Sequence, residues 1–240
     1  MPTTLTVQNT INWALPFIRY QPLTIGTASE PALSNANIIL QTILGPPFCW
    51  RWNRATNAAT MTVAGTQDYT VALSTFGFLE KASVTDSTGV VTELELKDVL
   101  SADTGSAANR SRPNFISTQA DNNAGNITFR LVPVPDAVYT LTLVYQNAAA
   151  LFASTNTTWA PVPDYFSYIY NRGFLSLAYA MADDPRFQIE HTRFLASLLA
   201  ASEGLSESQK NIFLGNFLAT TSQSQNAQLR TQQATQARGT

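Results

Sequence analysis

The chain has 240 residues, of which 45% are hydrophobic and 12% are charged, and its formal net charge is −2. Typical soluble domains carry about 25% charged residues, so a surface this poor in charge is expected to lie largely against other protein. A nucleic-acid binder needs a basic stripe to neutralise phosphates, and the chain contains no such stripe. Its single cysteine, Cys49, excludes an intramolecular disulfide and a cysteine-based metal site.

Membrane and export signals are not expected in this sequence. No apolar run approaches the roughly 20 residues of a membrane span. The N-terminal residues lack the basic start and apolar core of a secretory signal. We therefore expect a soluble protein made in the cytoplasm, with no membrane partner.

The N-terminal part is expected to form an arm followed by helical structure. A short helix is predicted over residues 9–17. A clearer helix follows, with Ser34 or Asn35 as its N-cap and with Gly45-Pro46-Pro47 at its end. Beyond it, alternating aromatic residues indicate a strand or an extended arm: Phe48, Trp50 and Trp52.

From residue 60 to about residue 145 the hydrophobic period changes from helical to two, which is typical of strands. A hairpin is predicted with its turn at Asp86-Ser87-Thr88-Gly89. The strongest signal covers residues 126–146, where the residues expected to share one face are Ile127, Phe129, Leu131, Tyr139, Leu141, Leu143 and Tyr145. These pieces predict a small antiparallel β sheet or barrel.

The helical period returns after residue 146. A helix over residues 164–182, with Asp164 as its cap, is apolar on two sides, so both sides should be buried. One of them is expected to face a neighbouring subunit. A second helix is predicted over residues 185–202, and Ser206 with Gln209 forms the capping box of a third.

The segment "AYAMADDPRFQIEH" contains the only histidine of the chain and two adjacent aspartates. A metal or acid–base site would need these groups to converge, but adjacent aspartates at a helix end point in different directions. Pro185 suits the first turn of a helix, and Asp184 before it is a natural N-cap. We therefore interpret Asp183, Asp184 and Pro185 as a structural helix corner, and His191 as part of a solvated or interfacial face.

These elements predict an α+β fold. A C-terminal helical bundle and an N-terminal helix are interrupted by the inserted β domain, and an extended polar arm follows. The expected domains are residues 1–58 (N-terminal arm and helix), 59–146 (inserted antiparallel β domain), 147–220 (helical domain packing with the N-terminal helix) and 221–240 (C-terminal arm). The arm is almost entirely Ser, Gln, Asn, Thr and Ala, so it cannot bury enough apolar surface to order itself without a partner.

The chain resembles the head-to-tail adaptor proteins of tailed bacteriophages, also called head-completion or neck connectors. The resemblance covers most of the chain. Its most telling parts are the strand turn within "RLVPVPDAVYTLTLVYQ" and the helix corner "AYAMADDPRF". It implies a structural virion protein in the neck, not an enzyme, with no cofactor and no catalytic or metal site.

The family likeness also implies partners. The chain would form a homo-oligomeric ring, commonly of twelve subunits, beneath the portal protein, and would contact a tail or nozzle protein. DNA would pass through the channel during ejection without specific binding. The helices over 164–182 and 185–202 would form the ring wall, with a subunit interface at Tyr165, Tyr168, Arg172, Leu175 and Tyr179. The portal-docking arm would use Gln223, Gln225, Gln228, Leu229, Arg230, Gln232, Gln233 and Arg238.

Four alternatives stay open at this point. A tail-tube or tail-terminator ring is the related one, although the helical C-terminal third argues against it. A virion-associated enzyme acting on carbohydrate would need paired carboxylates, for which the candidates are Glu80, Glu93 and Glu95. A sugar- or protein-binding β module could use Trp50, Trp52 and Trp159. A nucleic-acid clamp would use Trp50, Arg51, Trp52 and Arg54.

Overall fold

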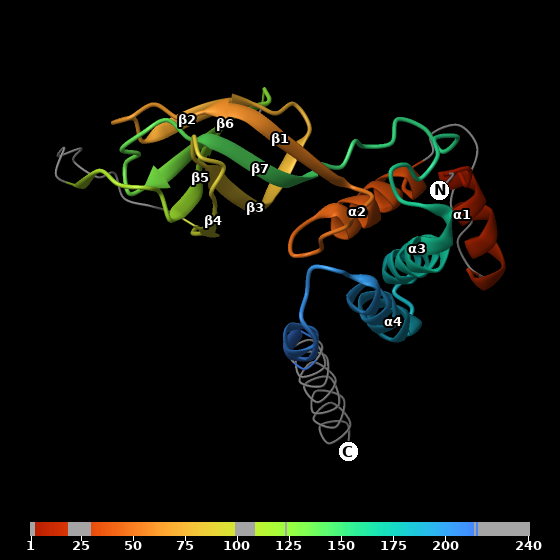
Figure 1. The fold of residues 1–240 in the computed structure, drawn as a ribbon. Coiled ribbons are helices and arrows are strands. Elements are labelled where there is room, and N and C mark those ends of the chain that lie inside the picture. Colours follow the sequence, from red (N-terminus) through yellow and green to blue (C-terminus); the bar gives the residue numbers. More distant parts are fainter. Residues whose placement is uncertain (1–2, 19–29, 99–108, 123, 214, 216–240) are drawn as a thin grey trace, which may run out of the picture. The chain divides into compact units, whose positions relative to one another are not determined.

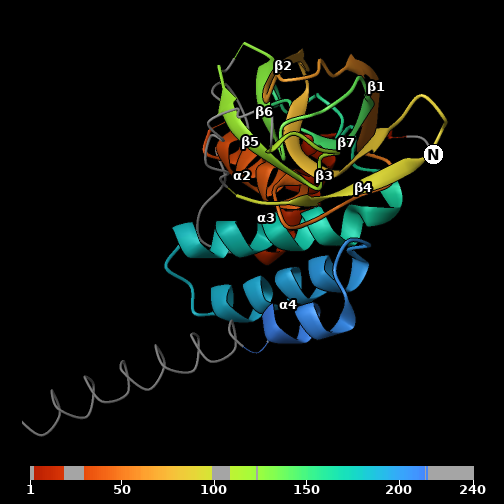
Figure 2. The same ribbon diagram turned by 60° about the vertical axis from the view of Figure 1, so that its left-hand side comes forward.

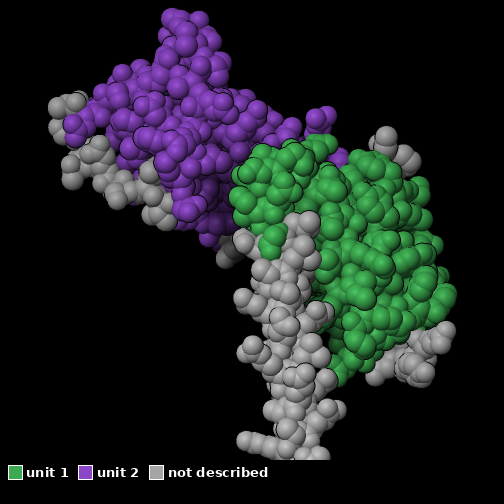
Figure 3. Space-filling view, turned by 90° about the horizontal axis from the view of Figure 1, so that it is seen from below, with its two compact units in different colours: residues 1–43, 151–240 green, residues 44–150 purple. Residues whose placement is uncertain are grey.

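The computed structural model describes residues 3–18, 30–98, 109–122, 124–213 and 215. Within it the chain divides into two compact units (Figure 3). Residues 1–43 and 151–240 belong to a helical unit, and residues 44–150 belong to a β unit. The α+β class predicted from the sequence is therefore confirmed.

The helical unit is built from short helices drawn from both ends of the chain (Figure 1). Its elements are α1 (Val7–Ala14), η1 (Leu15–Phe17), α2 (Ala32–Leu44), η3 (Asp164–Phe166), α3 (Ser167–Met181) and α4 (Arg186–Ala201). Residues 207–213 are also helical. The predicted capping box forms there, because Ser206 Oγ accepts from Gln209 N–H at 3.3 Å and Gln209 Oε1 accepts from Ser206 N–H at 2.9 Å.

Helix α3 is the central element of this unit. It lies beside α4 (Figure 2) and packs against α1. At Gly173 two neighbouring helices of the same chain come very close. An added Cβ would lie 2.8 Å from Ile39 of α2 and 2.9 Å from Phe194 of α4. A helix covered by its own chain on several sides must be apolar on more than one side, which explains the two apolar sides of the sequence pattern.

A second anchor of the helical unit is Trp159, which is fully buried. Its ring stacks on Tyr170 with centroids 4.3 Å apart and meets the edge of Phe152 at 5.1 Å. Its indole N–H donates to Thr10 Oγ1 at 2.9 Å, and its backbone N–H donates to the carbonyl of Leu5 at 3.0 Å. Trp159 therefore joins α1, α3 and the segment that leads from the β unit.

Two of the predicted helix starts are wrong. Helix α2 begins at Ala32, before Ser34 and Asn35, and the Glu30 carboxylate accepts from Ser34 N–H at 3.2 Å. Asp164 does not cap its own helix. Its carboxylate instead accepts from the backbone N–H groups of Thr4 and Leu5 at 2.9–3.1 Å. Long-range bonds of this kind cannot be inferred from local capping patterns.

The phenol oxygen of Tyr170 is buried without a hydrogen-bond partner in the described residues. An unpaired buried hydroxyl costs about 1–3 kcal/mol. We expect Tyr170→Phe to keep the stack on Trp159 and to raise the free energy of unfolding by about 1 kcal/mol. Urea denaturation followed by circular dichroism measures this. A variant less stable than the wild type would show that the hydroxyl has a partner.

The β unit is a nearly closed, barrel-like sheet of seven strands. They are β1 (Arg54–Met61), β2 (Asp68–Ala72), β3 (Phe76–Thr85), β4 (Val91–Leu96), β5 (Phe115–Asp121), β6 (Asn126–Val132) and β7 (Thr140–Asn147), in the order β1-β7-β3-β4-β5-β6-β2. The predicted all-antiparallel sheet is wrong in one place, because β4 and β5 pair in parallel. The crossover between them occupies the polar stretch that follows Asp98, part of which lies outside the described residues.

The interior of the β unit is formed by the residues that alternate along its strands. All seven residues predicted to share a face of residues 126–146 are buried there, and the predicted hairpin turn joins β3 to β4. The cluster contains Tyr69, Val71, Leu73, Ala82, Val84, Leu94, Ile116, Ile127, Phe129, Leu131, Tyr139, Leu141, Leu143 and Tyr145.

The segment before β1 was expected to be extended, but it is a series of turns between Arg51 and Asn53. Trp50 is buried and stacks on Trp52 with centroids 5.3 Å apart. The buried side chain of Gln146 holds the segment in place, because its oxygen accepts from Trp50 N–H at 3.1 Å and its amide donates to Glu80 at 2.7 Å.

Candidate functional site

The predicted subunit interface on α3 and the turn before it is only partly exposed. Leu175 and Tyr179 are 5% and 4% exposed within a single chain. The phenol of Tyr179 donates to the carbonyl of Phe17 at 3.4 Å, and the Arg186 guanidinium lies over its ring at 4.3 Å. As placed, Leu175 and Tyr179 offer no apolar area to a neighbour, because the chain's own unit covers them.

Tyr165, Tyr168 and Arg172 remain at the surface, and we call the two tyrosines the tyrosine face. The two tyrosines are 51% and 47% exposed. They flank Phe166, whose ring centroid lies 4.2 Å from that of Tyr165 and 6.4 Å from that of Tyr168. Exposed aromatic residues on a rigid helix are typical of the anchors that carry binding energy in protein interfaces.

Beside the tyrosine face, the carboxylate of Glu190 forms ion pairs with two arginines. Glu190 of α4 accepts from Arg172 at 3.2 Å and from Arg193 at 2.6 Å. Its side chain is 14% exposed, whereas the side chains of Arg172 and Arg193 are 40% and 58% exposed. The cluster therefore has a formal charge of +1 at the edge of the tyrosine face.

The residues Asp183, Asp184 and Pro185 lie at the turn between α3 and α4. Asp183 has a positive φ of 51°. Pro185, rather than Asp184, is the cap residue of α4, but the Asp184 carboxylate accepts from the backbone N–H of Arg186 at 2.9 Å and from its guanidinium. These bonds, led by the one from the Arg186 side chain, lower the pKa of Asp184 to about 2. The aspartate thus closes the first turn of α4.

The single histidine lies between aromatic rings of its own helix. Its ring centroid is 5.2 Å from that of Phe187 and 6.2 Å from that of Phe194. Burial lowers the pKa of His191. Among the residues that the structure describes, no three His, Cys, Asp or Glu side chains group as metal ligands would.

Of the carboxylates considered for carbohydrate chemistry, Glu80 and Glu95 form ion pairs within the chain. Burial opposes the ionisation of Glu80, but hydrogen bonds from Arg54 and Gln146 still lower its pKa. Glu93 and Glu95 lie exposed on β4, and Glu95 pairs with Lys97. A carboxylate held as an ion pair is a poor general acid, because that role needs a raised pKa.

Of the tryptophans considered for sugar or nucleic-acid stacking, Trp52 is half-buried and the other two lie inside the fold. Trp50 and Trp159 are 1% and 0% exposed, and their rings stack on residues of the same chain. Arg54 pairs with Glu80. A stacking platform must present a free aromatic face, and these two tryptophans do not.

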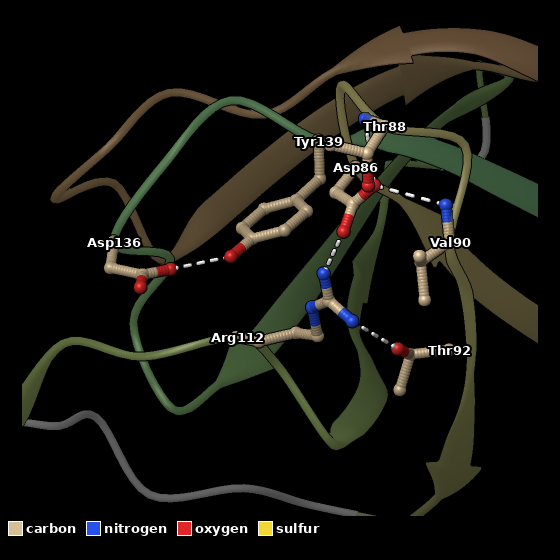
Figure 4. A network of polar contacts seen from close by, with 7 residues as sticks. All are labelled: Asp86, Thr88, Val90, Thr92, Arg112, Asp136 and Tyr139. Atoms are coloured by element: carbon tan, nitrogen blue, oxygen red, sulfur yellow. Dashed lines mark hydrogen bonds and ion pairs between the residues drawn. The ribbon is translucent and has the colours of Figure 1, made fainter.

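One end of the β unit is braced by polar side chains (Figure 4). Arg112 pairs with Asp86 in the β3–β4 turn, donates to Thr92 at 3.2 Å, and lies over the Tyr139 ring at 5.7 Å. Tyr139 in turn donates to Asp136 at 2.6 Å. These contacts hold the β3–β4 turn and the loop before β7, which carry the exposed Val90 and Val138. Val63, in the loop after β1, is exposed as well.

Asp86 makes this network sensitive to acid. The Thr88 side chain and the backbone N–H of Val90 hold its pKa at about 2, below the ordinary value of about 3.9. A lowered folded-state pKa stabilises the protein above the unfolded pKa, and this stabilisation is lost as the pH falls from about 4 to about 2.

We therefore expect Asp86→Asn to flatten the fall in thermal midpoint between pH 4 and pH 2. Thr88→Ala, which removes the donor with the largest effect, should flatten it by a smaller amount. Thermal melts across this range measure both. If Asp86→Asn left the slope unchanged, the Asp86 network would not contribute to acid stability.

The eight residues predicted for portal docking lie outside the described residues. Sequence reasoning missed another exposed apolar pair just before them, Ile212 and Phe213, which are 58% and 46% exposed. The signal was present in the strongly apolar run "IFLGNFL". Within the described part of the chain, no helix is long and apolar enough to cross a membrane.

A family model described as "SU10 adaptor protein" matches residues 42–223, more than half of the chain. A comparison with curated protein sequences gives no match. The matched range includes the whole β unit, α3, α4 and the helical residues 207–213.

Proposed function

Because the chain belongs to the SU10 adaptor protein family, a family of phage head-to-tail adaptors, we propose that it forms the ring that joins the portal to the tail. Such a ring leaves an axial channel for DNA. From the resemblance to head-to-tail adaptors, we expect the ring to have twelve subunits. The tyrosine face and the exposed pair Ile212 and Phe213 support this proposal. They provide apolar surface that one copy leaves uncovered.

The proposed ring would occupy the neck of the virion. Its C-terminal arm, residues 221–240, would dock on the portal, and its β unit would contact a tail or nozzle protein. The valine-tipped end of the β unit suits such a contact. Arg112 and Asp86 pair with each other there, and Asp136 accepts from Tyr139, so an apolar partner gains more at this end than a charged one.

The surface chemistry also suits a channel that DNA must traverse. A chain with a formal net charge of −2 lacks the excess of Lys and Arg that would hold phosphates through many contacts. We expect DNA binding by the assembled ring to be weak and to disappear at moderate salt. A tight complex with a steep salt dependence would contradict this feature of the proposal.

The direct test is binding to purified portal rings. We expect the full chain to co-sediment with portal rings, and a variant ending at residue 220 to lose at least ten-fold in affinity. Replacing Arg230 and Arg238 by Gln in the full chain is the matched control for charge. Failure of the full chain to bind the portal would overturn the proposal, and undiminished binding of the shortened chain would overturn the role of the arm.

A further inference from the structure

Strand β4 ends before the two strands that flank it. In the order of the sheet it lies between β3 and β5. It pairs with β3 only over residues 82–85 and with β5 only at Phe115 and Ile116. The other residues of these neighbours, 76–81 of β3 and 117–121 of β5, pair only on their far sides, with β7 and β6. In the described part of the chain, no strand pairs with these two inner edges, and we call the space between them the β4 slot.

Both inner edges extend past the same end of β4. Strand β3 is antiparallel to β4, so its residues before Ala82 lie beyond Leu94. Strand β5 is parallel to β4, so its residues after Ile116 lie beyond Leu96. An extended segment in the slot would therefore continue the line of β4 and complete the sheet.

The β5 wall of the slot offers a backbone donor and a backbone acceptor. The carbonyl of Ile116 accepts from Lys97 N–H at 2.9 Å, so the amide groups of Ile116 face β4. Residues two apart in a strand bond toward the same side, so the N–H and C=O of Thr118 face the slot. They have no backbone partner there among the described residues. An edge of this kind is a template for a further strand.

A cavity of about 240 Å³ lies in the slot. Its apolar lining is Leu79, Leu96 and Ile116, and Leu96 is 40% exposed. Apolar cavities of about 150 Å³ already bind a molecule as large as benzene, so this one can take an aliphatic side chain. Because side chains of a strand alternate between its two faces, a strand in the slot would direct every second side chain to the cavity side.

The unpaired charge at the cavity is negative. Asp98 lines it and is exposed, with no ion-pair partner among the described residues. The cation of the lining, Lys97, is already paired with Glu95 and lies over the Phe115 ring at 5.3 Å. A Lys or Arg in the entering segment would therefore gain a carboxylate partner, whereas an acidic residue would meet a like charge.

We propose that the β4 slot binds an extended segment of a partner protein. The segment pairs with Thr118, places one aliphatic side chain in the cavity and brings a Lys or Arg to Asp98. In strand addition, main-chain bonds supply affinity and side-chain pockets supply specificity. The slot lies at the opposite end of β3 from the β3–β4 turn, so it is separate from the end that carries Val90 and Val138. It belongs to a single β unit, so this inference goes beyond the proposed ring and does not depend on it.

The test measures binding of a fluorescent synthetic peptide to the full chain by anisotropy. The peptide has a central leucine, a lysine two residues before it and another two residues after it, and threonine at the other positions. We expect it to bind, and we expect peptides with aspartate for leucine, or with glutamate for both lysines, to bind at least ten-fold more weakly. Equal binding of the three peptides, or no binding of the leucine peptide, would overturn the site.

Variants of the chain locate the binding in the slot. Leu96→Glu should weaken the leucine peptide at least ten-fold, and Asp98→Lys should reverse the preference for lysine over glutamate. Both side chains are exposed, so the thermal midpoints should match that of the wild type. Val138→Glu, at the other end of the β unit, is the matched control and should keep the wild-type affinity. Unchanged binding by Leu96→Glu and Asp98→Lys would place the peptide elsewhere and overturn the proposal.

Amide hydrogen exchange at Thr118 is the second readout. Exchange should be fast in the chain alone and slow when the peptide is bound. Slow exchange in the chain alone would show that the slot is already filled, and loss of the homo-oligomer in Leu96→Glu would place a second copy there. Either result would overturn the assignment to a partner. Rings that bind the portal but not the peptide would reject only the slot, whereas a chain that binds the peptide and forms no ring would keep the slot and contradict the proposed function.

Discussion

Replacing Trp159 by alanine should lower the free energy of unfolding by about 3–5 kcal/mol, the usual range for removing a buried tryptophan. The indole is fully buried between Tyr170 and Phe152. Alanine would leave a cavity among these rings and would remove the donor to Thr10. The packing of α1 against α3 should weaken as well, because Trp159 contacts Thr10 of α1 and Tyr170 of α3.

The effect is measured by urea denaturation of the full chain followed by circular dichroism. Trp13→Ala is the matched control, because Trp13 belongs to the same unit but is 39% exposed, and its ring lies 5.2 Å from that of Phe17. We expect that control to cost about 1 kcal/mol or less. Equal losses for the two variants would show that Trp159 does not anchor the helical unit.

The second large effect is expected at Gly173 in the middle of α3. Alanine has the higher helix propensity, by about 0.8–1 kcal/mol, so a surface glycine would gain from the change. Here the added Cβ would lie 2.8 Å from Ile39 and 2.9 Å from Phe194. Both are buried side chains, so overpacking should cost about 1–3 kcal/mol and should outweigh the gain in propensity.

Gly215→Ala provides the matched control for Gly173→Ala. A Cβ at Gly215 would meet no atom of the described residues within 4 Å, so that substitution should leave stability unchanged or slightly higher. The same denaturation measurement compares the two. If Gly173→Ala stabilised the protein as much as Gly215→Ala, the close packing of α2, α3 and α4 at Gly173 would be contradicted.

In the β unit, the burial pattern of some strands could be predicted from the sequence and that of others could not. Strand β6 alternates strictly between buried and less buried residues, and β7 does so up to Tyr145, so their pattern and common face were predictable. Strand β1 has the sequence RATNAATM and hardly any buried residue. It is a strand because β7 offers it an edge to pair with, and a partner of this kind leaves no local pattern. The parallel pairing of β4 with β5 was unpredictable for the same reason.

The helical unit shows the limit of reading an interface from a helix pattern. Tyr168, Leu175 and Tyr179 are all apolar positions of one helix, and sequence cannot say whether each is covered by the chain itself or by a neighbour. The structure covers Leu175 and Tyr179 and leaves Tyr168 exposed. Asp164 is a similar case, because its bonds to Thr4 and Leu5 join residues about 160 positions apart.

The measurement that bears most directly on the proposed function is electron microscopy of the purified full chain mixed with portal rings. We predict rings stacked coaxially on the portal, with an open axial channel and a native mass equal to a whole-number multiple of one chain. The account proposes that the apolar surface exposed on one copy is covered by neighbouring copies in a neck ring. A chain that keeps the mass of a single copy and does not bind the portal would contradict it.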